Sequence, residues 1–181
     1  MKKNNKESKL SSQKSFGVKT QTQELKHLGS ALTEYPDHYS PELLEAFPNK
    51  NPSQIAWTTF ICTEFTSLCP KTGQPDFAKI FVNYIADQKM VESKSMKLYL
   101  FSFRNHGDFH EDCVQKICTD LVKLLKPKYL EVIGEFTPRG GISIFPFASW
   151  SNSEKQFQAL GQDRLRNYAP GKYSMSLAQL Y

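Results

Sequence analysis

The chain has 181 residues, within the range of a single domain, and 39% of them are hydrophobic and 23% charged. This composition is ordinary for a globular protein, and no apolar run is long enough to cross a bilayer. The N-terminus also lacks the apolar stretch of a secretory signal. We therefore expect one globular domain in a reducing cytoplasm, away from membranes, with its four cysteines as free thiols.

The net charge of +5 belongs to the N-terminal segment, because residues 1–26 hold seven lysines and two glutamates. Residues 1–25 have few large apolar groups and are predicted to be a disordered basic tail. The remaining chain is neutral, so no direct nucleic-acid binding is expected. Residues 26–56 are proline-rich and predict an irregular arm. One short helix is expected at residues 41–47, capped by Ser40 and started by Pro41.

The predicted domain, residues 57–147, begins with two strands and continues with two helices. Residues 57–65 and 77–85 are rich in β-branched and aromatic side chains, and the turn-rich loop between them predicts that the strands pair. Apolar side chains at i, i+3, i+4 and i+7 predict helices over residues 92–104 and 109–126. Asp108 is placed to cap the second helix, and Pro127 ends it.

Two further strands, residues 129–137 and 142–147, are joined by a turn whose two glycines permit the positive φ of a tight hairpin. The fold class is therefore α+β, with a four-stranded antiparallel sheet covered by two helices on one face. The open edges of such a sheet must be blunted or paired with another subunit. Residues 148–181 form a C-terminal extension, with a short helix predicted at residues 154–166.

Cys69 and Asp76 are the first candidates for chemistry. Because Pro70 disfavours the α conformation at Cys69, the thiol should project from a loop outside any helix. Gly73 and Pro75 then turn the chain toward Asp76, and a carboxyl near a thiol suggests a nucleophile with a proton donor. Each residue also has a structural interpretation, as a small buried side chain and as a turn aspartate.

Residues 106–112 concentrate two histidines and three acids, which are possible zinc or iron ligands. Gly107 between the histidines, and the absence of a C-x-x-C pair, argue against a metal site. Lys94 and Lys97 lie at i, i+3 on a predicted helix, and Arg139 lies in the hairpin turn. These cations are either solvated surface charges or a site for a phosphate-rich cofactor. The sequence has no G-x-G-x-x-G motif, so it does not indicate a Rossmann cofactor site.

Together these segments resemble the NADPH-dependent 7-cyano-7-deazaguanine reductases, the QueF family of queuosine biosynthesis, in its short single-module form. The resemblance runs from about Trp57 to Pro146. It rests on Glu64-Phe-Thr-Ser-Leu-Cys-Pro-Lys-Thr-Gly-Gln-Pro-Asp76, Val91-Glu-Ser-Lys-Ser-Met-Lys-Leu-Tyr99, Phe103-Arg-Asn-His-Gly-Asp-Phe-His-Glu111 and Phe136-Thr-Pro-Arg-Gly-Gly-Ile-Ser143.

The resemblance implies the tunnelling fold, in which such units form an oligomeric barrel, here expected as paired pentamers with active sites at subunit boundaries. It also implies NADPH as co-substrate, two per turnover, and no catalytic metal. Cys69 would be the nucleophile and Asp76 the general acid. The substrate would be held by Val91, Glu92, Ser93, His110 and Glu111, and NADPH by Ser93, Lys94, Lys97, Arg139 and Gly140.

Two alternatives remain: a cyclohydrolase-like pterin or purine enzyme of the same fold, which needs zinc, and a non-catalytic purine-binding ring. Given the role of Glu111, Cys113 lies close to the expected pocket, and a reactive thiol is prone to oxidation. A reversible Cys69–Cys113 disulfide is therefore a further hypothesis, and it needs Cα atoms within about 7 Å.

Overall fold

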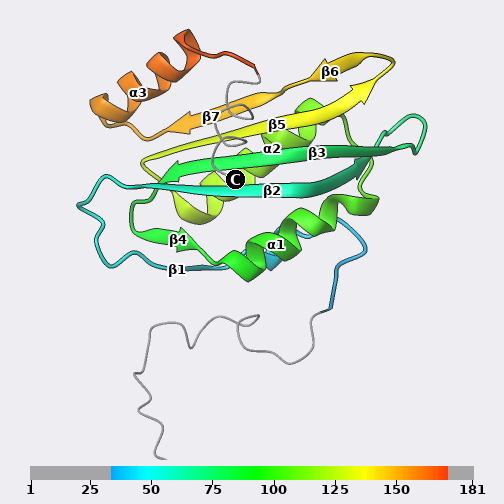
Figure 1. Ribbon diagram of the computed structural model, residues 1–181. Coiled ribbons are helices and arrows are strands. Elements are labelled where there is room, and N and C mark those ends of the chain that lie inside the picture. Colours follow the sequence, from blue (N-terminus) through cyan, green and yellow to red (C-terminus); the bar gives the residue numbers. More distant parts are fainter. Residues whose placement is uncertain (1–33, 171–181) are drawn as a thin grey trace, which may run out of the picture.

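The computed structural model describes residues 34–170 (Figure 1). The predicted tail, the start of the arm and the last part of the C-terminal extension lie outside these residues. In chain order the elements are the 3₁₀ helix η1 (Pro41–Leu43), β1 (Ala46–Pro48), β2 (Trp57–Leu68), β3 (Pro75–Ile85), β4 (Lys89–Val91), α1 (Ser93–Phe101), the 3₁₀ helix η2 (Ser102–Asn105), α2 (His110–Leu125), β5 (Tyr129–Arg139), β6 (Ile142–Ile144), β7 (Phe147–Ser151) and α3 (Lys155–Arg166).

The main sheet is antiparallel, with β2 paired to β3 and β3 to β5. Both β6 and β7 pair with β5, one after the other along its free edge, so the sheet has five strands. A single last strand was expected. It is interrupted after Ile144, and the carbonyl of Pro146 accepts a hydrogen bond from Gly134 before β7 begins. Proline has no N–H to donate to a ladder, which explains why the strand breaks there.

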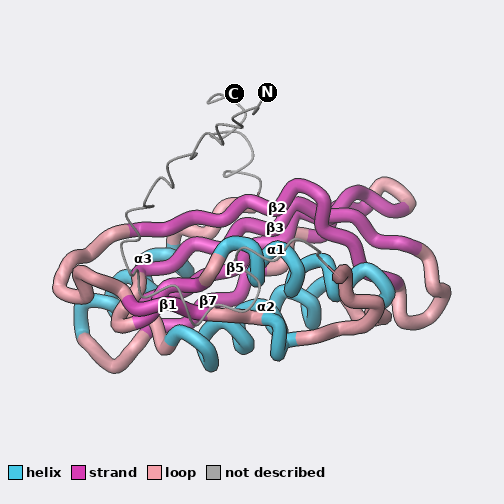
Figure 2. Tube along the Cα trace, turned by 90° about the horizontal axis from the view of Figure 1, so that it is seen from below, coloured by secondary structure: helices cyan, strands magenta, loops and turns pink. Residues whose placement is uncertain are grey.

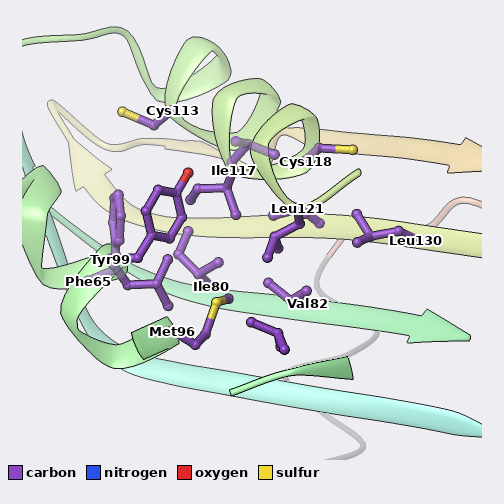
Figure 3. Packing of buried hydrophobic residues seen from close by; sticks show 14 of the residues in the cluster. Phe65, Ile80, Val82, Met96, Tyr99, Cys113, Ile117, Cys118, Leu121 and Leu130 are labelled. Carbon is purple, nitrogen blue, oxygen red and sulfur yellow. The ribbon is translucent and has the colours of Figure 1, made fainter. Parts of the chain in front are cut away.

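One face of the sheet is covered by α1 and α2, as expected (Figure 2). Alternate side chains of β3 and β5 point to this face, where Ile80, Val82 and Leu130 meet Ile117 and Leu121 of α2 (Figure 3). The opposite face carries α3, the helix predicted at residues 154–166. Phe157 of α3 packs on Ile85 and Tyr129, and Arg164 binds the buried Glu131 through two hydrogen bonds.

Two local predictions were wrong. The expected helix at residues 41–47 is only the 3₁₀ turn η1, and the chain then extends into β1, which pairs with β4 in a small second sheet. Asp108 is not the cap of α2, whose N-cap is Phe109. By contrast, the hairpin glycines adopt the positive φ that was predicted, 56° at Gly140 and 81° at Gly141.

Candidate active site

Cys69 lies directly after β2 in the six-residue loop that leads into β3, outside any helix, as predicted. Its backbone N–H donates to the Gln74 carbonyl, and its own carbonyl accepts from Gly73, so the loop is closed on itself. The Thr72 hydroxyl, the backbone N–H groups of Lys71 and Thr72, and the Arg139 guanidinium lower the pKa of the Cys69 thiol from 9.0 to about 7. Because the thiolate is the reactive form of cysteine, this lowering of the pKa favours reaction of Cys69 near neutral pH.

Asp76 lies next to this loop, near the start of β3, and its side chain is 3% exposed. It stands directly opposite Ser67 in the β2–β3 ladder. Cys69 is two residues beyond Ser67, which makes it the diagonal neighbour of Asp76, a relation that spans about 7 Å between backbones. The hairpin register thus places Cys69 and Asp76 as diagonal neighbours.

Two basic side chains meet at one oxygen of Asp76. His110 Nε2 lies 2.8 Å from Oδ1 of Asp76, and Arg139 Nη2 lies 2.6 Å from the same oxygen. The same Arg139 nitrogen donates to the carbonyls of Gln74 and Pro75. Figure 1 shows that the β2–β3 and β5–β6 turns lie at the same end of the sheet. This arrangement explains why Arg139, at the end of β5, can reach Asp76, at the start of β3.

His110 is held in place from two sides. It is the first residue of α2, and its ring stacks on that of Phe136 with centroids 4.0 Å apart and 12° between the planes. The preceding loop is tied to the end of β2, since Leu68 donates to the His106 carbonyl and accepts from the Asp108 N–H. His110 therefore faces Asp76 from a rigid support, and Glu111 follows it with an exposed side chain on the same helix turn.

The Asp108 side chain stabilises this loop. Its carboxylate forms an ion pair with Lys116 and contacts His106 Nε2 at 3.2 Å. The pKa of Asp108 is lowered because these hydrogen bonds outweigh its burial. Among residues 34–170, no group of three or more His, Cys, Asp or Glu side chains is arranged to hold a metal ion.

Val91, Glu92 and Ser93 lie elsewhere, where β4 leads into α1. Glu92 is buried and caps α1, accepting hydrogen bonds from the N–H groups of Lys94 and Ser95 at 2.8 and 2.7 Å. The Val91 N–H donates to the Tyr84 hydroxyl. Tyr84 is eight residues from Asp76 along β3, or roughly 26 Å of strand. Within one chain, Val91 therefore lies far along β3 from Asp76, whereas Ser93 lines a groove that extends toward the Asp76 end of the strand.

A groove of about 790 Å³ lies between β2 and α1. Ser93, Lys97 and Arg104 contribute its polar and cationic lining, and Lys97 Nζ donates to the Tyr35 hydroxyl at 3.2 Å. The groove reaches Thr66 and Phe77, the pair adjacent to Ser67 and Asp76. Arg139 and Gly140 are at the β5–β6 turn, outside this lining. Of the expected NADPH residues, Ser93 and Lys97 thus line the groove and Arg139 and Gly140 lie at the end of the sheet, while Lys94, on α1, belongs to neither group.

Sequence reasoning missed three contributors to this geometry. Thr72 stabilises the Cys69 thiolate, Phe136 orients His110, and Arg139 contacts Asp76. Of these three residues, only Thr72 could have been identified from the sequence, because a short polar side chain three residues after a cysteine in a turn can donate a hydrogen bond to the thiolate. Within residues 34–170, no helix is long and apolar enough to cross a membrane.

Comparison with known proteins extends this description. A family model described as QueF-like protein matches residues 75–155. A protein of Bdellovibrio bacteriovorus named NADPH-dependent 7-cyano-7-deazaguanine reductase is 74% identical over 85% of this chain and 91% of its own length. Proteins with the same name from Neisseria meningitidis and Porphyromonas gingivalis are 62% and 57% identical, covering 76% and 84% of this chain and 88% and 98% of themselves.

A solved structure supports the fold. The crystal structure of the archaeosine synthase QueF-Like in the apo form aligns with a TM-score of 0.51 over 56% of this chain and 99% of that one. Its identity is 17%, so this likeness concerns the fold alone. The α+β architecture expected from the sequence is shared with that protein. The extent and identity of the sequence matches establish that the chain belongs to the QueF-like family.

Proposed function

We propose that this protein is an NADPH-dependent reductase that converts 7-cyano-7-deazaguanine to 7-aminomethyl-7-deazaguanine, a step of queuosine biosynthesis. The observation that carries the proposal is the loop cysteine Cys69 with a lowered pKa, the diagonal neighbour of the buried Asp76, in a chain 74% identical to a reductase of that name. The names of the relatives favour this reaction over a cyclohydrolase-like enzyme or a non-catalytic purine-binding ring. Nitrile-dependent consumption of NADPH by the purified chain tests it.

Cys69 is the proposed nucleophile. A nitrile carbon is electrophilic but reacts poorly with hydride, and addition of the thiolate forms a C–S bond while the nitrogen gains a proton. The product is a thioimide, whose C=N bond accepts hydride more readily. The hydrogen bonds from Thr72 and from the loop N–H groups serve this step, because they populate the thiolate before substrate binds.

Asp76 is the proposed proton donor. It neighbours Cys69 across the hairpin, so it can take the thiol proton and deliver it to the nitrogen of the substrate. Its Oδ1 is bound by His110 and Arg139, which fixes the orientation of the carboxyl group. Oδ2 is then the oxygen that exchanges the proton.

NADPH supplies hydride, and two molecules are needed because reduction of a nitrile to an amine takes four electrons. The groove between β2 and α1 has the size of a ligand pocket, and Lys97 and Arg104 line it together with Ser93 and the acid Glu64, which gives it two cations for a phosphate-bearing cofactor. Lys94 follows Ser93 on α1. Arg139 and Gly140 would approach the cofactor from the β5–β6 turn. The groove reaches Phe77, the residue that follows Asp76 in β3, so it extends to the end of the sheet that holds the proposed catalytic pair.

The separation of Val91 from Asp76 within one chain supports an oligomer. Val91 lies at the Tyr84 end of β3, far from Asp76 of the same chain, so we propose that Val91 and Glu92 of one subunit meet Cys69, His110 and Glu111 of a neighbouring chain. The edge strand β2 also carries the exposed apolar side chains of Trp57 and Ile61. We propose a barrel of tunnelling-fold units, as paired pentamers, with each active site at a subunit boundary.

Glu111 is the proposed recognition residue, since its two carboxylate oxygens match two parallel N–H donors on a guanine-like edge. Glu111→Leu should weaken binding of the nitrile by about 3 kcal/mol or more, because each charge-assisted hydrogen bond contributes roughly 1.5–3 kcal/mol. Asp112→Leu, an equal change of charge at the next exposed residue of the same helix turn, is the control. Calorimetric titration measures both, and equal affinity of Glu111→Leu and wild type would remove Glu111 from the site.

Lys97 is the proposed phosphate contact in the groove. Lys97→Glu should raise the KM for NADPH by tenfold or more, roughly the effect of reversing one charge next to a phosphate. Turnover at saturating NADPH should change far less. Lys123→Glu, an exposed change on α2 away from the groove, is the control. If both variants have the wild-type KM, Lys97 does not contact the cofactor.

The Cys69–Cys113 disulfide stays a prediction. Cys113 is fully buried at the start of α2, its thiol lies beside the Ser67 hydroxyl, and burial raises its pKa to about 12. Ser67 is two residues from Cys69, so the pairing requires the Cys69 loop to move toward the start of α2. Mild peroxide followed by non-reducing peptide mapping should yield a Cys69–Cys113 peptide, and dithiothreitol should restore activity. Equal, reversible inactivation of wild type and Cys113→Ala would contradict the pairing.

A further inference from the structure

Arg139 contacts both the buried carboxyl of Asp76 and the backbone next to the Cys69 loop. Binding of a cofactor alone would not require these contacts. Arg139 extends from the end of β5, next to the hairpin turn, and its side chain is 29% exposed. Nη2 lies 2.6 Å from Oδ1 of Asp76, 2.6 Å from the Pro75 carbonyl and 3.1 Å from the Gln74 carbonyl. These three acceptors belong to consecutive residues, 74–76, where the chain leaves the Cys69 loop and enters β3. The guanidinium therefore braces the loop and the buried carboxyl at once.

The charges around Cys69 and Asp76 explain why a cation is needed here. Asp76 is the diagonal neighbour of Cys69 in the hairpin register, and the proposed reaction moves one proton between these two groups, so that the pair carries one negative charge. His110 of α2 and Arg139 of β5 are the side chains that face the carboxyl, while the buried Cys113 lies behind Ser67. Asp108 and Lys116 pair with each other. Of these groups, Arg139 alone is permanently cationic and contacts both Asp76 and Cys69.

We propose that Arg139 is a positioning residue of the reaction: it pairs with Oδ1 of Asp76 and lies beside the Cys69 sulfur, so that the thiolate is present before any ligand binds. The proposal rests on the proposed function, in which Cys69 attacks a nitrile. It adds a role in the free enzyme to the contact with NADPH proposed above. The guanidinium stabilises the single negative charge that Cys69 and Asp76 carry between them, whichever of the two holds the proton.

Alkylation of Cys69 tests this without nitrile or nicotinamide. The full-length protein is treated with iodoacetamide across pH 5–10, and peptide mass spectrometry gives the rate at Cys69. The midpoint should rise in Arg139→Gln by about one pH unit, with a roughly tenfold slower reaction on the acid side. Arg139→Lys keeps the charge but not the planar fork, so its midpoint should rise by less. Arg166→Gln on α3 removes an exposed cation and should match wild type.

Circular dichroism confirms that each variant is folded, and Arg139→Lys carries the test if Arg139→Gln does not fold. A wild-type midpoint in folded Arg139→Gln, or in Arg139→Lys when it is the only folded variant, would overturn the proposal. That result would leave the reductase function intact, because the assay contains neither substrate. A wild-type protein with the expected alkylation profile but no nitrile reduction would instead contradict the proposed function.

Discussion

Cys69→Ala is expected to abolish nitrile reduction and covalent capture of the nitrile together. Wild-type protein incubated with 7-cyano-7-deazaguanine and no NADPH should gain the mass of one substrate molecule per chain, with a new thioimide absorbance. The variant should gain neither, because alanine has no atom that can attack the nitrile carbon. Loss of the nucleophile should lower turnover by at least about 10⁴-fold, as it does where a nucleophile acts within a catalytic group.

Cys118→Ala is the matched control for this experiment. It removes another thiol of the same chain, one that is buried on α2 with a pKa raised by burial to about 11. This variant should still form the adduct at Cys69, located by peptide mapping. An adduct on a different cysteine, or an active Cys69→Ala protein, would be incompatible with the mechanism.

Asp76→Asn should lower turnover by roughly 10²–10⁴, the range that general acid–base catalysis contributes. Asparagine keeps the shape of the side chain but cannot release a proton to the substrate nitrogen. Substrate affinity should change much less, because Glu111 and not Asp76 is assigned to the base. Rapid-quench measurement of a single turnover, compared with calorimetric affinity, separates the two effects.

Asp163→Asn serves as its control, since Asp163 is an exposed carboxylate on α3, where it accepts a hydrogen bond from the side chain of Asn167. Thermal unfolding of Asp76→Asn should be recorded as well, because Asp76 is buried and pairs with His110 and Arg139. A folded Asp76→Asn protein with near-normal turnover would reduce Asp76 to a structural residue of the hairpin.

The sequence predicted those parts of the fold whose signal is local. Helix α2 has an apolar stripe that recurs over four turns, and β2 and β3 are long enough to show strand composition on both sides of a turn. The paired strands β1 and β4 have three residues each, too few to show any period, and Pro48 lies in one of them. Their pairing depends on where the sheet and α1 place the arm.

The site was predictable to a similar extent. Cys69 and Asp76 are close because one hairpin holds both, and the Pro70–Pro75 turn makes that hairpin visible in the sequence. The contact of Arg139 with Asp76 joins residues 63 positions apart, and it depends on the register between β3 and β5. The cap formed by Glu92 was also missed, because glutamate is not among the residues preferred at a helix N-cap.

The most direct test of the central claim is NADPH oxidation followed at 340 nm with the purified chain and 7-cyano-7-deazaguanine, together with chromatographic quantification of the amine. The account predicts nitrile-dependent oxidation of two NADPH for each 7-aminomethyl-7-deazaguanine formed, and no such oxidation with Cys69→Ala. Binding of the nitrile without NADPH oxidation, or oxidation that yields no amine, would contradict it.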